Sequence, residues 1–141
     1  MAFVYRSEVH FDELDAMKML HNSRFLTHVE RATGAWYAKL GHKWELNPAD
    51  NPDQFHVVRE FCIEFLSPVM GIGVLDVALW VERLGNTSCR YGFRLLSEHG
   101  IEHARGTRTI VKLDPATRKP SPWTEGFREH HAALIVSAAT Q

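Results

Sequence analysis

A single long helix with one apolar face limits the possible folds of this chain more than any other feature. Apolar side chains recur every three to four positions, which places them on one side of a helix. They are Phe25, Leu26, Val29, Ala32, Thr33, Trp36, Tyr37 and Leu40. Asn22 or Ser23 is expected to cap the start, and Gly41 to stop the helix. A helix about 27 Å long with one broad apolar face needs a flat apolar surface to cover it.

The rest of the chain predicts that surface. Residues 3–11 alternate in character, with Phe3, Tyr5, Ser7, Val9 and Phe11 on one face, as in a half-buried strand. Further strands bounded by turn residues are predicted at Val57–Leu66, Val74–Arg83, Thr87–Ser97 and Glu102–Leu113, and a short helix capped by Thr124 from about Thr124 to Ile135.

One strand, one long helix and then four strands joined by short turns predict an α+β fold. We expect a single domain over residues 1–141, in which an antiparallel five-stranded sheet wraps around one long central helix. This architecture is the hotdog arrangement.

Composition argues against several classes of function. With 16 basic and 17 acidic residues the net charge is -1, so no overall charge favours nucleic acid as a partner. No apolar stretch approaches the ~18 residues that span a bilayer, and the start lacks the pattern of a signal peptide. Cys62 and Cys89 are predicted to be buried, because they are far apart in apolar surroundings. We expect a cytoplasmic protein with no cofactor, and no ligand spacing predicts a metal site.

The stretch Glu13–Leu26 resembles the first signature of the 4-hydroxybenzoyl-CoA thioesterase family, D-x-D-A-x-G-H-V-N-N-A-R-Y-L. Later stretches resemble that family's motifs in the same order; they are Phe65–Pro68 with Gly71–Gly73, Val81–Ser88, and Gly106–Asp114 with Lys119–Trp123. The resemblance implies a hotdog acyl-CoA thioesterase that acts on a small-molecule acyl-CoA. It also implies a homodimer or homotetramer, because the active site in this family is completed by a neighbouring subunit.

The chain departs from the family pattern within this first signature. Glu13 replaces the first Asp and keeps a carboxylate. Lys18 stands where Gly is common, and lysine tolerates positive φ poorly. Met19 stands where many members have His, which excludes a histidine-assisted mechanism at that position. His21 takes the place of the first Asn.

The resemblance implies that Asp15 is the carboxylate that drives hydrolysis. Thioester hydrolysis needs an activated water or nucleophile and a stabilised oxyanion. Asp15 could attack the thioester or deprotonate water. The first N–H groups of the helix, near Asn22–Phe25, could bind the oxyanion because they lack intrahelical partners. The structural alternative for Asp15 is a loop acid that stabilises a turn.

The other candidates also have two interpretations each. His21 is either a proton carrier or a loop residue that contacts the backbone, and Asn22 either orients water or the thioester or caps the helix. The candidates for binding substrate are Ser23, Phe25, Glu60, Thr87 and Ser88. Phe25 also fits the helix core, and Glu60 a solvated strand face. The rival functions are a non-catalytic acyl-binding hotdog protein and an acyl-carrier-protein thioesterase.

Overall fold

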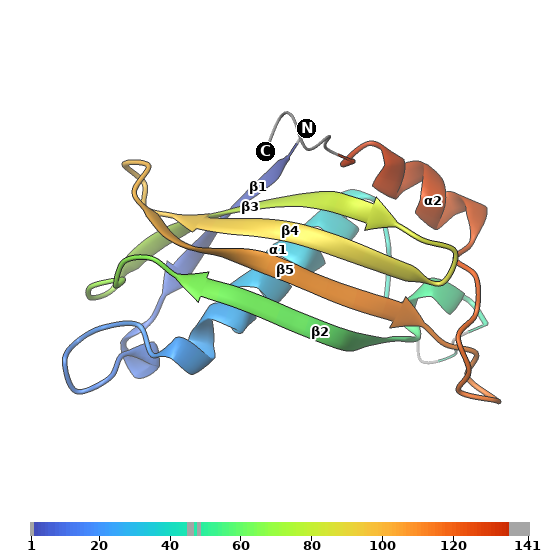
Figure 1. Ribbon diagram of the computed structural model, residues 1–141, viewed down its shortest axis with the longest axis horizontal. Coiled ribbons are helices and arrows are strands. Elements are labelled where there is room, and N and C mark those ends of the chain that lie inside the picture. Colours follow the sequence, from blue (N-terminus) through green and yellow to red (C-terminus); the bar gives the residue numbers. More distant parts are fainter. Residues whose placement is uncertain (1, 45–46, 48, 136–141) are drawn as a thin grey trace.

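The computed structural model describes residues 2–44, 47 and 49–135 and shows a five-stranded antiparallel sheet with one long helix against it (Figure 1). The strands are β1 (Phe3–Val9), β2 (His56–Phe65), β3 (Gly73–Leu84), β4 (Ser88–Leu96) and β5 (Glu102–Lys112). Their order in the sheet is β1-β3-β4-β5-β2. Each boundary lies within two residues of its predicted position, and the hotdog arrangement is confirmed.

Helix α1 (Phe25–Lys39) lies across the inner face of the sheet. The predicted stripe faces the sheet, although Leu26 and Leu40 are only partly buried and His28, which was not predicted, is fully buried. Most of its sheet contacts are with β1 and β3. Burying a large apolar side chain contributes about 1.5–3 kcal/mol, so this contact contributes several kcal/mol to the stability of the fold.

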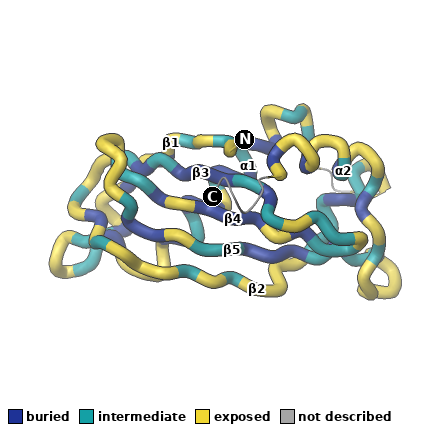
Figure 2. The backbone as a smooth tube through the Cα atoms, turned by 45° about the horizontal axis from the view of Figure 1, so that its top comes forward, coloured by how far each residue is buried: buried dark blue, intermediate teal, exposed yellow. Residues whose placement is uncertain are grey.

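The residues of β2 are therefore less buried than those of the central strands, as Figure 2 shows. β2 is an edge strand that pairs only with β5. Cys62 on this strand is exposed, so the prediction that it is buried was wrong, whereas Cys89 on β4 is buried as predicted. An edge strand can look apolar in sequence and still lack neighbours on one side.

The ends of several elements differ from the predictions. β1 stops at Val9, and Phe11 begins a 3-10 turn, η1 (Phe11–Glu13), where its side chain is 80% exposed instead of facing inward. Helix α2 (Glu125–Ala132) is shorter than predicted, but its cap is confirmed because the Thr124 hydroxyl accepts a hydrogen bond from Phe127 N–H. Gly41 has a φ of 81° and ends α1 as expected.

A buried chain of hydrogen bonds ties α1, β4 and α2 together. The Tyr37 hydroxyl lies 2.8 Å from the Tyr91 hydroxyl, which donates to His131 Nε2 at 2.6 Å. His131 Nδ1–H donates to the carbonyl of Phe127 at 2.9 Å. A neutral imidazole has one donor and one acceptor, so both ring nitrogens are satisfied only without a second proton. Burial lowers the pKa of His131 from 6.5 to about 3.

This depressed pKa predicts that the fold weakens in mild acid. Below pH 6.5 His131 binds a proton in the unfolded chain but not in the folded chain. The free energy of unfolding therefore falls as pH falls. One such group contributes up to ~1.4 kcal/mol per pH unit. Urea unfolding between pH 7.5 and 5 should show this slope, and His131→Gln should reduce it. Equal slopes in the two proteins would contradict the assignment.

Candidate active site

Asp15 lies on a tightly closed loop that precedes α1. Its N–H donates to the Met19 carbonyl at 2.8 Å, and Lys18 N–H donates to the Asp15 carbonyl at 3.0 Å. Oδ1 of Asp15 accepts hydrogen bonds from the N–H groups of Met17 and Met19 at 2.8 and 3.2 Å. No residue in the described part of the chain donates to Oδ2. One carboxylate oxygen therefore holds the turn, and the other remains available for chemistry.

Lys18 adopts the backbone conformation that would suit a glycine. Its φ is 64°, which costs a non-glycine residue roughly 1–2 kcal/mol. The loop is fixed by the adjacent segment, since Gly71 N–H donates to the Lys18 carbonyl at 2.8 Å and Met19 forms a bridge with Met70. The loop thus reaches a positive φ without a glycine, and its contacts with residues 70–71 hold that conformation.

Glu13 binds the residues on both flanks of this loop. The residue is 3% exposed, and its Oε2 accepts a hydrogen bond from His10 N–H at 2.6 Å. Its carbonyl accepts a hydrogen bond from His21 N–H at 2.9 Å. The residue before the loop and the residue after it are therefore tied to one buried glutamate.

The other oxygen of Glu13 begins a buried chain to the sheet. His28 on α1 lies with Nε2 at 2.7 Å from Glu13 Oε1 and with Nδ1 at 2.6 Å from the Ser7 hydroxyl on β1. Burial lowers the pKa of His28, and the nearby Glu13 carboxylate only partly offsets this. The imidazole is therefore neutral, donating from Nε2 to Glu13 and accepting from Ser7. This chain joins the loop, α1 and β1.

His21, and neither Asn22 nor Ser23, caps the start of the helical segment, so both predicted caps were wrong. Its Nδ1 accepts a hydrogen bond from Ser23 N–H at 3.1 Å and lies 2.8 Å from the Ser23 hydroxyl, while its carbonyl accepts from Arg24 N–H at 2.9 Å. A 3-10 turn, η2 (Asn22–Arg24), leads into α1. The Asn22 N–H and side chain have no hydrogen-bond partner among the described residues.

The predicted substrate-binding residues divide into two groups. Ser23 is exposed beside Asn22, and Phe25 is buried with its ring edge-to-face against Phe65 at 5.0 Å, so Phe25 is a core residue at the helix start. Glu60 is exposed on β2 and points away from α1, because it lies on the face opposite Phe61. Glu60 and Asp15 of the same subunit therefore do not form part of one site.

Thr87 and Ser88 lie even farther from the loop. They occupy the β3–β4 hairpin, whereas the Asp15 loop contacts the segment just before β3. β3 has 12 residues and spans about 40 Å. The structure thus places Asp15, His21, Asn22 and Ser23 at one helix start and separates them from Glu60, Thr87 and Ser88 within a protomer.

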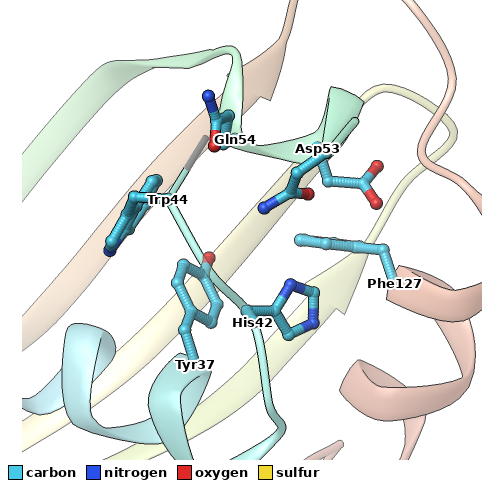
Figure 3. Close-up of a pocket in the computed structure, with 7 residues that line it drawn as sticks. Tyr37, His42, Trp44, Asp53, Gln54 and Phe127 are labelled. Carbon is cyan, nitrogen blue, oxygen red and sulfur yellow. The ribbon is translucent and has the colours of Figure 1, made fainter. Parts of the chain in front are cut away.

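A small hollow lies at the end of α1 opposite the Asp15 loop (Figure 3). Tyr37, His42, Trp44, Asp53 and Phe127 are among its lining residues, and the Asp53 carboxylate is bound to the N–H and hydroxyl of Thr124. Its volume is about 10 Å³, room for roughly one water molecule. It lies at the C-terminal end of the 15-residue helix α1, about 22 Å along the axis from the helix start. This hollow is too small for an acyl group.

None of the helices in residues 2–44, 47 and 49–135 is long and apolar enough to cross a membrane. Nor does the described part of the chain bring three or more His, Cys, Asp or Glu side chains together as metal ligands.

The buried hydrogen bonds that link Glu13 to His28 and His28 to Ser7 were not predicted from the sequence. The signal was present, because His28 falls at a helical position within the apolar stripe and Ser7 on the inward face of the first strand. Polar residues at core positions need hydrogen-bond partners, and His28 and Ser7 are hydrogen-bonded to each other.

The same fold occurs in solved thioesterase structures. A 1,4-dihydroxy-2-naphthoyl-CoA thioesterase from Synechocystis is 18% identical, with 95% of this chain and 98% of that chain covered and a TM-score of 0.84. A DHNA-CoA thioesterase from Staphylococcus aureus is 19% identical, with 94% and 90% covered and a TM-score of 0.81. A Thermus thermophilus thioesterase described in complex with coenzyme A and Zn is 24% identical, with 93% and 92% covered and a TM-score of 0.75.

At these identities the structures establish similarity of fold. No curated protein matches the chain in sequence. The family model described as the thioesterase-like superfamily matches residues 9–130, which include the Asp15 loop, α1 and every strand after it. The chain belongs to the thioesterase-like superfamily.

Proposed function

We propose that the protein is a cytoplasmic acyl-CoA thioesterase that hydrolyses its substrate to a free acid and CoA at Asp15. The observation that carries the proposal is the state of this carboxylate. It is fixed in position through Oδ1 and presents Oδ2 without a partner among the described residues, on the loop that precedes η2 and α1. A non-catalytic acyl-binding protein has no need of an acid held in this way.

The geometry supports two routes, and both use Oδ2. Asp15 either attacks the thioester carbonyl carbon or takes a proton from a water molecule that attacks it. In the first route an oxyanion forms, the C–S bond breaks to release CoA thiolate, and water then hydrolyses the anhydride between Asp15 and the acyl group to free the acid. In the second route water adds to the carbonyl as Asp15 takes its proton, the C–S bond of the oxyanion intermediate breaks, and the thiolate takes that proton from Asp15. The Asn22 N–H is the donor best placed for the oxyanion, since the amides of Ser23 and Arg24 already have acceptors.

The neighbouring histidine has a defined part in this proposal. Nδ1 of His21 accepts hydrogen bonds from Ser23, so the ring proton is on Nε2. This N–H is in an exposed ring beside the helix start and could donate a hydrogen bond to the leaving thiolate, whose proton comes from the Asp15 carboxyl or from water. Glu60, Thr87 and Ser88 could contact the substrate only from a neighbouring subunit, because in their own chain Glu60 points away from α1 and the other two lie at the far end of β3.

Replacing Asp15 by Asn tests the catalytic role without opening the loop. The Asn side-chain oxygen can still accept from Met17 and Met19, but it lacks the charge needed to attack or to take a proton. We expect kcat to fall by about 10²–10⁴-fold, with the thermal midpoint nearly unchanged. Asp12→Asn, at an exposed acid in η1, is the matched control and should retain activity. Activity of Asp15→Asn within threefold of wild type would exclude Asp15 as the catalytic carboxylate.

The buried hydrogen bonds of Glu13 predict a second kinetic effect. Glu13→Gln replaces one acceptor oxygen by an amide donor and removes the charge, so both contacts weaken and His28 has to change tautomer to keep its own, at about 1–3 kcal/mol in unfolding free energy. Because the loop then shifts, kcat should fall roughly tenfold with KM little changed. Glu8→Gln, exposed on the other face of β1, is the control. If Glu13→Gln is destabilised but keeps full kcat, the hydrogen bonds of Glu13, His28 and Ser7 have only a structural role.

We also propose that the protein assembles through β2 as a homodimer or homotetramer. This edge strand has unpaired backbone groups, and large apolar side chains on or beside it are exposed; they are Val57, Val58, Phe65 and Leu66. Exposed apolar edge strands favour pairing with another chain. A neighbouring subunit could then complete the site near Asp15.

Light scattering after gel filtration checks the assembly. The mass should be at least twice 16.1 kDa at micromolar concentration. Val58→Lys should shift the protein toward the monomer, because it places a charge on this edge. Ile101→Lys, at an exposed apolar residue before β5, should not change the mass. A 16.1 kDa wild-type species would overturn the assembly proposal.

A further inference from the structure

Arg108 is a charged residue on the inner face of the sheet. It lies on β5, directly opposite Tyr91 on β4 and Phe61 on β2, both of which point toward α1. The residue is only 7% exposed. Arginine is almost never buried to this extent unless its charge is paired.

The contacts of Arg108 do not satisfy its guanidinium group. Among the described residues its one ion-pair partner is Glu30 on α1, with Nη2 and Oε1 3.8 Å apart, beyond hydrogen-bond distance. The Glu30 side chain is itself 50% exposed. Nε of Arg108 is buried without any hydrogen-bond partner among the described residues. A buried guanidinium in this state favours an additional acceptor with two oxygens.

A row of apolar side chains leads from the helix start to Arg108. Phe65, Ile63 and Phe61 alternate along the inner face of β2, and all are partly exposed. Phe65 contacts Phe25 in the first turn of α1, and Phe61 stacks on Phe93 at 5.6 Å. We name these three β2 residues the apolar row.

The apolar row is the right size for an acyl chain. From Phe65 to Phe61 the strand advances about 13 Å. Along α1 the distance from Phe25 to Glu30, which approaches the guanidinium, is about 7.5 Å. A chain of intermediate length that begins at the helix start could therefore place its far end at Arg108.

We propose that Arg108 binds a carboxylate at the far end of the acyl group, so that the preferred substrates are CoA thioesters of dicarboxylic acids. This inference rests on the function proposed above. The methylenes would lie along the apolar row, and the terminal carboxylate would meet the planar guanidinium, which binds two oxygens side by side. Glu30 would turn toward solvent, to which it is already half open.

Matched substrates test the proposal directly. Hexanoyl-CoA and adipoyl-CoA have equal chain lengths but differ in a terminal carboxylate, and octanoyl-CoA and suberoyl-CoA form a second pair. For wild type the ratio of kcat/KM, diacid over monoacid, should exceed tenfold in at least one pair. Arg108→Met should reduce this ratio roughly 30–1,000-fold, the usual effect of removing one partner of a buried charge pair.

Other variants separate recognition from folding. Arg108→Lys keeps a charge without the planar fork, so its ratio should lie between those of wild type and Arg108→Met. Glu30→Gln removes the competing carboxylate and should lower KM for the diacid substrate a few-fold. Arg105→Met is the matched control, because Arg105 is exposed on the other face of the same strand. A ratio at or below one in wild type, or an equal loss in Arg105→Met, would overturn the proposal.

Binding of free acids checks Arg108 without hydrolysis. Millimolar adipate should raise the thermal midpoint of wild type but not of Arg108→Met. Hexanoate should have the same effect on the thermal midpoints of both proteins. If no acyl-CoA is hydrolysed while adipate still binds through Arg108, the thioesterase proposal fails and the carboxylate site stands. If hexanoyl-CoA is hydrolysed and adipate does not bind, the thioesterase proposal stands and the carboxylate site fails. A 6-hydroxyhexanoyl-CoA preferred over adipoyl-CoA would also exclude carboxylate recognition.

Discussion

The packing of one apolar helix face against the inner side of the sheet organises the whole molecule. Val29, Ala32 and Trp36 are buried against strands whose inward side chains are also buried. Because α1 lies mainly against β1 and β3, its start is fixed next to the ends of these strands, where the Asp15 loop is anchored. The same off-centre placement leaves the inner face of β2 partly open. The candidate catalytic carboxylate and the apolar row therefore both follow from a single packing contact.

Polar contacts inside this packing make the site rigid. Glu13 holds both flanks of the loop and is itself held by His28 on α1, whose other nitrogen meets Ser7 on β1. Each buried group has a partner when His28 is neutral, which is the state that burial favours. A functional carboxylate supported by regular elements keeps its position better than one on a mobile loop. Arg108 is the contrast, because its buried charge lacks a comparable set of partners.

Periodicity predicted the elements well because each one buries a single face. The spacing of Phe25, Val29, Ala32 and Trp36 predicts one side of a helix, and alternation predicts the strands. Neighbour relations are not encoded in local spacing. Cys62 was therefore predicted to be buried, although it lies on an edge strand.

The site was predictable only where the family signature reached it. The signature drew attention to Asp15, but local sequence could not show that one oxygen is used by Met17 and Met19 and the other is not. It could not show that a lysine at position 18 would keep a positive φ, because contacts from residues 70–71 enforce it. The separation of Thr87 and Ser88 from Asp15 depends on the length and direction of β3, which become clear only in three dimensions.

The central claim is that the wild-type protein cleaves thioesters, and release of free CoA thiol tests it most directly. A thiol reagent can follow this release from a panel of aliphatic, aromatic and dicarboxylic acyl-CoA substrates. The account predicts a kcat/KM of about 10⁴ M⁻¹s⁻¹ or more for at least one of them, as is usual for an enzyme on its own substrate. Thiol release no faster than in buffer for every substrate, at saturating concentrations and with folded protein, would contradict it.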